Sequence, residues 1–253
     1  MTFPQSIYPC YAAASGFSPA SLNPVHWYDF TDPTVLFQEI TGGSATTPAG
    51  VGNLVGTIRN KGSAGGYAQA PTTGARCTLI QQGTYTAVQG AINLYYTITT
   101  GYSMATGGAS TIYHSFYRAS TTQYSANFGN ETGASAYPSW QLNSATPEAY
   151  IYLGGSFMDV VSGMPANTVA GHVMTTRQNA ANTLDFFYDN TQVLTASANT
   201  PSCTLINVFH PDSGANNYNI SPAFAVLIFN SAHTGTDLSN MKTYMGALAG
   251  IVL

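Results

Sequence analysis

The chain has 253 residues, of which 6 are Lys or Arg and 10 are Asp or Glu, so charged residues make up 6% of the sequence. This is about a quarter of the usual share, which leaves Ser, Thr, Asn, Gln, Gly and Tyr to form most of the surface. The basic residues are scattered singly, so the sequence has no basic stripe to bind nucleic acid or anionic lipid. The expected partners are neutral ligands such as glycans, or other protein subunits.

The amino-terminal residues 1–21 contain three prolines and no periodic apolar pattern. They are predicted to form an extended arm that packs on a neighbouring subunit, while residues 22–253 form one domain. The first residues lack the basic region of a secretory signal, and the longest apolar run, 223–229, is far shorter than the roughly 20 residues that cross a bilayer. We therefore expect neither signal-dependent secretion nor membrane insertion.

Short segments rich in β-branched and aromatic residues recur between Gly, Asn, Ser, Thr and Pro clusters, as in antiparallel sandwiches. A loop-rich stretch at 41–66 contains one short predicted strand, 54–59. The further predicted strands are 94–99, 111–118, 150–153, 172–177, 184–188, 192–196 and 204–209. Turn-forming residues at 189–191 predict a hairpin between two of them. The segment 223–229 is apolar at successive positions, which predicts a central strand covered on both faces.

Near the carboxyl end, apolar residues recur at the three- and four-residue spacings of a helix, namely Leu238, Met241, Met245 and Leu248. Thr236 and Asp237 are the expected caps, and the helix is expected to lie across a sheet edge or rim. Alternation with apolar neighbours places His114 and His172 toward the core, which favours structural roles for both.

Four segments resemble, in order, the motifs of concanavalin A-like, laminin-G-like jelly-roll domains of phage virion and bacterial surface proteins. PVHWYDFTD at 24–32 resembles the opening W-x-D-x-x-D motif, and RNKGS at 59–63 is similar to the W-x-D-K-S-G loop, although the aromatic and first acid are replaced. HVMTTR at 172–177 with LDFFYDNTQV at 184–193 resembles the family hairpin, and FAVLIFN at 224–230 with 238–244 resembles the closing strand and helix. The resemblance implies an all-β jelly-roll sandwich of two antiparallel sheets over 22–253, with one short carboxyl-terminal helix. Because the superfamily includes lectins, glucanases, sialidase-associated modules and structural domains, function must be argued from sites.

Sugar binding requires an aromatic face surrounded by amides and carboxylates, and two segments offer that composition. One contains Tyr137 and Trp140 in a predicted loop. The other combines Asp212, Asn216, Asn217 and Tyr218. The alternative interpretation is that Trp140 is a core residue and that the second segment is an ordinary connection between strands.

Metal and cofactor chemistry has little support in the sequence. Asp29 and Asp32 could contribute oxygen ligands to calcium, although turn formation and strand capping explain the pair equally well. No histidine or cysteine spacing completes a transition-metal set. The three cysteines, Cys10, Cys77 and Cys203, form no C-x-x-C motif and are expected to be reduced and buried. No cofactor is predicted.

A glycosidase needs two carboxyls about 5 to 10 Å apart. Glu39, Glu131 and Glu148 are isolated in the sequence. Asp185 and Asp189 would share one face of a strand, but residues of an exposed hairpin explain them equally well. No catalytic residue is predicted, and the chain is expected not to be an enzyme.

The expected function is a non-enzymatic virion surface component, such as a capsid decoration, spike or tail-associated protein. It would be made in the host cytoplasm, form homo-oligomers, contact other virion subunits through the apolar residues 251–253 among others, and bind host or environmental glycans. The alternatives are a free carbohydrate-binding lectin and a polysaccharide-degrading glycoside hydrolase.

Overall fold

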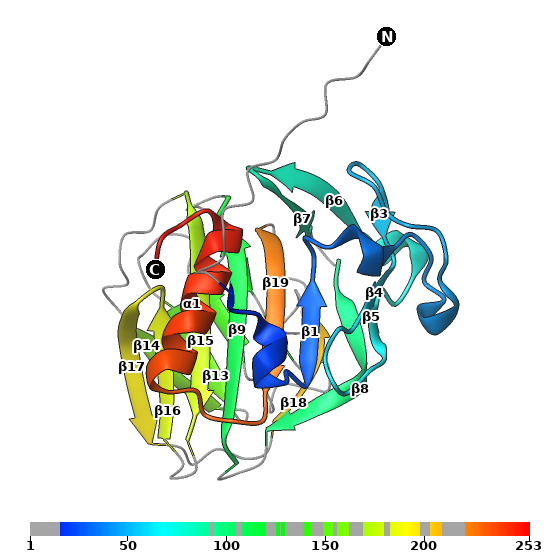
Figure 1. The fold of residues 1–253 in the computed structure, drawn as a ribbon. Helices are drawn as coiled ribbons and strands as arrows, with labels where there is room; N and C mark the ends of the chain where they lie inside the picture. Colours follow the sequence, from blue (N-terminus) through cyan, green and yellow to red (C-terminus); the bar gives the residue numbers. More distant parts are fainter. Residues whose placement is uncertain are drawn as a thin grey trace.

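Within its described residues, the chain forms a β-sandwich of two main sheets, with a third, smaller sheet and a helix on the outer face of the larger main sheet (Figure 1). The computed structural model describes residues 16–91, 94–104, 108–119, 125–126, 128–129, 139–142, 149–153, 156–161, 169–179, 183–197, 203–208 and 221–253. Of these, 103–104, those between 125 and 161, 196–197 and 203–208 are described by backbone alone.

The larger sheet contains nine antiparallel strands within the described residues. They are β1 (His26–Asp29), β3 (Leu54–Val55), β6 (Cys77–Gln82), β7 (Tyr85–Gln89), β9 (Ser110–Tyr117), β15 (Gly171–Gln178), β16 (Thr183–Tyr188), β17 (Thr191–Ser197) and β19 (Pro222–Phe229). Their order is β17-β16-β15-β9-β19-β7-β6-β3, and β1 pairs with β19.

The other described strands form a six-stranded and a four-stranded sheet. The six-stranded sheet consists of β2 (Leu36–Phe37), β4 (Thr57–Arg59), β5 (Tyr67–Gln69), β8 (Tyr96–Met104), β11 (Phe128–Gly129) and β18 (Cys203–Val208), in the order β11-β18-β8-β5-β4-β2. The four-stranded sheet has the order β10-β12-β13-β14, with β10 (Ser125–Ala126), β12 (Ser139–Leu142), β13 (Ala149–Leu153) and β14 (Ser156–Val161). Short 3-10 helices occur at η2 (Pro19–Leu22), η3 (Pro33–Val35), η4 (Gly42–Ser44) and η5 (Thr73–Ala75).

Strand β19 is the centre of the larger sheet, and all eight of its residues are buried. It pairs with β9 on one side and with β1 and β7 on the other. Val226 and Ile228 belong to the apolar core shared with Ile58 and Tyr96 of the six-stranded sheet. The prediction of a central strand at 223–229 is confirmed, because a strand apolar at every position can be buried on both faces.

Helix α1 (Gly235–Ala249) covers the opposite face of the larger sheet (Figure 1). Met241 and Met245 pack there in a second apolar cluster with Leu227 and Phe229 of β19. The helix therefore lies over the face of the sheet, and the prediction that it crosses an edge is wrong, because β19 carries apolar side chains on both faces. The N-cap is Thr234, two residues before the predicted cap, and its side chain makes no capping hydrogen bond.

The predicted all-β sandwich with one carboxyl-terminal helix is confirmed, and most of the predicted strands occur within a few residues of their expected bounds. The single strand expected at 54–59 is interrupted at Gly56, which separates β3 from β4. A Cβ atom at Gly56 would lie 2.5 Å from the backbone oxygen of Glu39, so the chain comes too close here for any other residue. Strands β6 and β7 had no counterpart among the predicted elements.

The predicted hairpin is present, with Asp189 in its turn at a φ of 53°. Asp185 lies within β16, whereas Asp189 lies beyond its end, so the expectation that they share one face of a strand is wrong. Asp189 Oδ1 accepts a hydrogen bond from Val173 N at 2.8 Å, and Asp189 Oδ2 lies 3.0 Å from His172 Nδ1. Both predicted core histidines are buried, with 1% of His114 and 5% of His172 exposed.

Cys77 is buried and reduced, and burial raises the pKa of its thiol to about 12. It therefore stays protonated and unreactive near neutral pH. Cys10 lies outside the described residues, and Cys203 is described by its backbone alone. Helix α1 is too short to cross a bilayer, and the described residues include no helix that could do so.

Candidate functional site

The glycan-binding residues predicted from the sequence lie mostly outside the described part of the chain. The residues outside it are Tyr137, Asp212, Asn216, Asn217 and Tyr218. Trp140 lies in strand β12, where its Cα is paired with that of Ile151 on β13. The prediction of a loop at Trp140 is therefore wrong, because this segment is part of an antiparallel ladder.

The two carboxylates considered as calcium ligands are bridged by an ammonium group. Lys61 Nζ lies 2.9 Å from Asp29 Oδ2 and 2.9 Å from Asp32 Oδ2. The same nitrogen lies 4.3 Å from the centroid of the Trp27 ring. Asp29 Oδ1 also accepts hydrogen bonds from the backbone and hydroxyl of Thr31, as expected for turn formation. The ammonium occupies the position between the carboxylates, and the described residues contain no group of three or more His, Cys, Asp or Glu that could hold a metal ion.

The loop that resembles the family motif at 59–63 is packed against β1. Asn60 Oδ1 accepts hydrogen bonds from Trp27 N at 2.7 Å and from Gly62 N at 2.8 Å. A Cβ atom on Gly62 would lie 2.4 Å from the backbone oxygen of Val25, so glycine is required for this approach. These contacts give Asn60 and Gly62 a structural role, since they attach the loop to β1 and to the residue before it.

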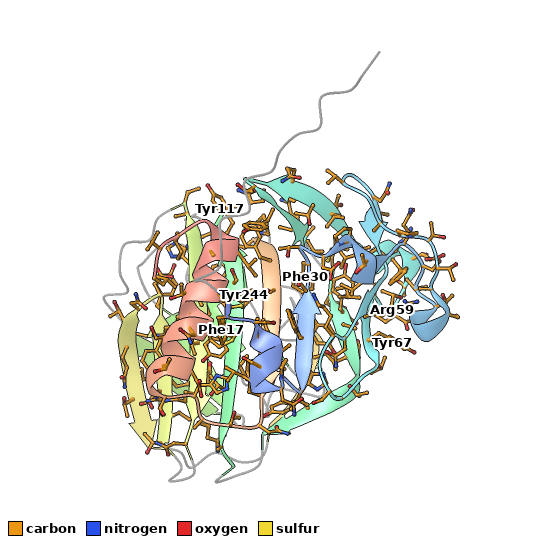
Figure 2. The ribbon with its side chains drawn as sticks, viewed as in Figure 1. Phe17, Phe30, Arg59, Tyr67, Tyr117 and Tyr244 are labelled. Carbon is orange, nitrogen blue, oxygen red and sulfur yellow. The ribbon has the colours of Figure 1, made fainter. Side chains whose placement is uncertain are left out.

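A pocket of about 540 Å³ opens between the turn that joins β6 to β7 and the carboxyl-terminal end of α1. Its volume lies within the roughly 300–1,000 Å³ typical of small-molecule sites. Its aromatic wall contains Tyr85 and Tyr117, and Gln82, Thr84 and Thr243 contribute polar groups. The other lining residues are Gly83, Phe224 and Ala247–Leu253. In Figure 2, Tyr117 lies at the end of α1, far across the view from Tyr67.

The turn that carries Tyr85 is held by local hydrogen bonds. Gly83 adopts a φ of 60°, a conformation that favours glycine. The side-chain amide of Gln81 donates to the backbone oxygens of Gly83 at 2.9 Å and Tyr85 at 3.1 Å. The turn and the first residue of β7 are therefore tied to one side chain, which helps to fix the backbone of Tyr85 beside the pocket.

The opposite wall is formed by the residues that follow α1. Gly250 ends the helix at a φ of 75°, and Ile251 N donates to Gly246 O at 2.9 Å. The hydroxyl of Thr243 donates to Leu253 O at 3.2 Å, so the segment folds back on the helix. Of the apolar residues 251–253 expected to contact partners, Ile251 and Leu253 are partly buried in this wall, and Val252 is fully exposed.

Replacing Gly171 with alanine is expected to separate this end of α1 from the sheet. A Cβ atom at Gly171 would lie 1.9 Å from the backbone oxygen of Ala249, a residue that lines the pocket. Because a backbone atom cannot move aside alone, we expect Gly171→Ala to lower the free energy of unfolding by about 2–3 kcal/mol. Urea denaturation measures this loss. Gly74→Ala is the matched control, since the nearest atom to its new Cβ is 3.9 Å away. Equal stabilities of the two variants would contradict the packing described here.

The side chains that line the pocket are all uncharged. The carboxyl-terminal end of a helix also carries partial negative charge on its last carbonyl groups, which disfavours anions there. The geometry therefore suits a neutral ligand with an apolar ring face and several hydroxyl groups.

Comparison with known proteins shows the fold of the chain. Neither a protein-family model nor a curated protein sequence matches it. Among solved structures, an arabinofuranosidase complexed with arabinofuranosyl-alpha-1,2-xylobiose is similar, with a TM-score of 0.64 and 11% identity over 89% of this chain and 63% of that one. The binding domain of Paraclostridial Mosquitocidal Protein 1 has a TM-score of 0.54 at 9% identity, over 77% of this chain and 52% of that one. A Trypanosoma rangeli sialidase has a TM-score of 0.53 at 9% identity, over 82% of this chain and 35% of that one.

These similarities correct one expectation drawn from the sequence. The prediction that the chain is not an enzyme is wrong, because glycoside hydrolases are among the solved structures most similar to it. A small number of charged residues does not exclude such an activity, since a glycosidase needs only two carboxyls. The chain spans less than two thirds of the length of these structures.

The pocket was missed in the sequence because its parts are far apart along the chain. Its walls come from residues 82–85, 117, 224, 243 and 247–253. The one local indication is the run Gln82-Gly83-Thr84-Tyr85, which places a tyrosine after a turn-forming glycine. Such a run occurs in many hairpins, so only the fold shows that Tyr117 and α1 lie beside it.

Proposed function

We propose that this chain is a carbohydrate-binding β-sandwich that holds a neutral sugar unit in the pocket beside the end of α1. The observation that supports it best is that Tyr85 and Tyr117 both line a pocket without charged side chains. Several solved structures with this fold belong to proteins whose names denote action on sugars.

The chemistry of a pyranose or furanose ring matches the lining of this pocket. One face of a sugar ring presents C–H groups, which pack on aromatic side chains, while its hydroxyl groups need hydrogen-bond partners. Tyr85 and Tyr117 offer aromatic surface, and Gln82 and Thr243 offer an amide and a hydroxyl. A neutral surface also avoids the cost of removing charged groups from water on binding.

Replacing Tyr117 with alanine is expected to weaken sugar binding at least ten-fold, which corresponds to about 1.4 kcal/mol. The side chain is partly buried on an otherwise intact strand, so most of the loss arises from the missing aromatic surface. A glycan array identifies the neutral oligosaccharide that the full chain retains best, and titration calorimetry with that oligosaccharide measures the change.

Tyr67→Ala provides the matched control, because Tyr67 is also partly buried and lies on β5, away from the pocket (Figure 2). Its affinity for the same oligosaccharide is expected to equal that of the unaltered chain. Retention of no neutral glycan, or equal losses in both variants, would contradict the proposed site. Chromatography of the incubated oligosaccharide shows whether it is also cleaved.

We further propose that the chain lies on a virion surface, with other virion subunits as partners. The low charge of the chain and the fully exposed Val252 support contacts with other proteins. Sedimentation of the chain with native particles and its mass in solution test this part. A chain found only in soluble fractions as a monomer would contradict it.

A further inference from the structure

Two of the chain's six basic residues converge on one aromatic ring beside α1. Lys242 Nζ lies 3.9 Å from the centroid of the Phe187 ring, and Arg177 Cζ lies 5.3 Å from the same centroid. Lys242 is carried by α1, while Arg177 and Phe187 lie on the neighbouring strands β15 and β16. Two cations near one ring repel each other unless negative charge balances both.

Within the described part of the chain, the carboxylate bound to this group is that of Asp185, and both of its oxygens are occupied by other hydrogen-bond donors. Asp185 Oδ2 accepts hydrogen bonds from Arg177 Nη2 at 2.6 Å and Nε at 3.0 Å. Asp185 Oδ1 accepts from Gln192 Nε2 at 3.0 Å and Thr195 Oγ1 at 2.8 Å. Asp185 therefore balances the charge of Arg177 and has no oxygen left for Lys242.

Lys242 has no carboxylate within ion-pair distance in the described part of the chain, although only 5% of the residue is exposed. Burial, followed by the nearby charge of Arg177, lowers the pKa of Lys242 to about 8. Asp189 acts in the opposite direction, but its carboxylate contacts His172 Nδ1 and Val173 N. The ammonium of Lys242 is thus a buried charge without a partner of opposite sign, which is unfavourable unless a ligand supplies one.

A buried hydroxyl group without a partner lies next to this pair. Thr175 Oγ1 is enclosed and makes no hydrogen bond. Thr175 pairs with Phe187 across β15 and β16, so the two side chains are neighbours on the same face of the sheet. The hydroxyl of Thr175 therefore lies beside the aromatic ring that Lys242 Nζ contacts.

We propose that Lys242, Arg177 and Thr175 form a binding site for a carboxylate group, supplied by a small organic acid or by an acidic sugar. A carboxylate carries the single negative charge that balances Lys242, and its two oxygens accept hydrogen bonds from the ammonium, the guanidinium and the hydroxyl. The site is separate from the neutral pocket, since it lies over β15 and β16, whereas the pocket lies beside β6 and β7.

Titration calorimetry of the full chain with acetate and with glucuronate, at pH 7 and low ionic strength, tests this site. We expect saturable binding of at least one of them, at least ten-fold weaker in Lys242→Met and within about three-fold of the original affinity in Lys242→Arg. Thr175→Val is expected to weaken binding without changing the charge. Arg59→Met is the matched control, because Arg59 also stacks on an aromatic ring, Phe37, at 4.2 Å.

The two ligands distinguish the two sources of the carboxylate. Tighter binding of glucuronate than of acetate indicates an acidic sugar, and equal affinities indicate a small organic acid. Absence of saturable binding by both ligands would overturn the proposal. Binding that is unchanged in Lys242→Met would also overturn it. If that variant does not fold, the proposal is overturned by binding that is unchanged in Thr175→Val, or by binding that is weakened as much in Arg59→Met as in Thr175→Val.

Discussion

Lowering the pH from 7.5 to 4.5 is expected to reduce the free energy of unfolding by about 2.7 kcal/mol or more, through histidines that are buried in the uncharged form. His114 has the largest effect, because complete burial lowers its pKa from 6.5 to about 3. Its ring stacks on Phe116 at a centroid distance of 5.1 Å inside the sandwich, where an added proton would be poorly solvated.

The sign follows from proton binding in the two states. Below pH 6.5 the unfolded chain protonates His114 and the folded chain does not, so acid favours the unfolded state. The stability that the chain gains from keeping His114 uncharged is fully present above pH 6.5. It decreases as the pH falls below 6.5 and is lost once the pH falls through the pKa of the folded chain, near 3. Each pH unit in this window removes about 1.36 kcal/mol, so two units give about 2.7 kcal/mol.

Two further histidines act in the same direction. Burial lowers the pKa of His26, whose Nε2 lies 3.0 Å from Gly101 O. Burial also lowers the pKa of His233, whose Nδ1 lies 3.0 Å from the hydroxyl of Tyr113. Both are expected to add to the loss of stability in the same pH window.

Urea denaturation at pH 7.5, 6.5, 5.5 and 4.5 measures the effect. In His114→Gln the decrease in stability over this range is expected to be smaller than in the unaltered chain, whatever the stability of the variant at pH 7.5. Equal stability of the unaltered chain at pH 7.5 and 4.5 would contradict an uncharged, buried His114.

The sequence predicted the fold best where a local pattern of apolar or turn-forming residues matches the burial of the segment. In 223–229 every residue is apolar, which predicted the buried central strand, and Asp189 and Asn190 predicted the turn after β16. The helix was predicted from its spacing, but its position was not, because spacing shows which face is apolar and not which surface covers it.

Strands β6 and β7 were missed because their buried side chains are few. Only Cys77 and Leu79 in β6, and Ala87 and Val88 in β7, are fully buried. Gln and Thr occupy most of the other positions, as they do in the loops of this chain. In a protein with so few charged residues, a half-exposed strand and a loop have nearly the same composition, so alternation is weak.

The candidate site depends on contacts that sequence spacing cannot show. The tyrosines of the pocket are separated by 32 positions in the chain, at 85 and 117, and the group around Lys242 joins α1 to β15 and β16. At helical spacing, Lys242 falls on the apolar face of the helix. A lysine is usually expected to be exposed to solvent, so the sequence does not predict that this one is buried. Only the packing of α1 on the sheet shows that it is buried.

Replacing Asp185 with alanine is expected to lower the free energy of unfolding by about 3–5 kcal/mol, the usual cost of removing one partner from a buried ion pair. Asp185 is 5% exposed and forms hydrogen bonds with Arg177, Gln192 and Thr195. The alanine would leave the guanidinium of Arg177 beside Lys242 with no negative charge to balance them.

A double variant separates the part of this lost stability that arises from the ion pair between Asp185 and Arg177 from the part that arises from the other contacts of Asp185. Arg177→Met removes the second charge, so we expect Asp185→Ala with Arg177→Met to be more stable than the sum of the two single losses predicts. Asp237→Ala is the matched control, because Asp237 is exposed in the first turn of α1, where a carboxylate contributes about 0.3–1 kcal/mol. If Asp185→Ala lost no more stability than Asp237→Ala in urea denaturation, the ion pair between Asp185 and Arg177 would contribute no more to stability than an exposed carboxylate does.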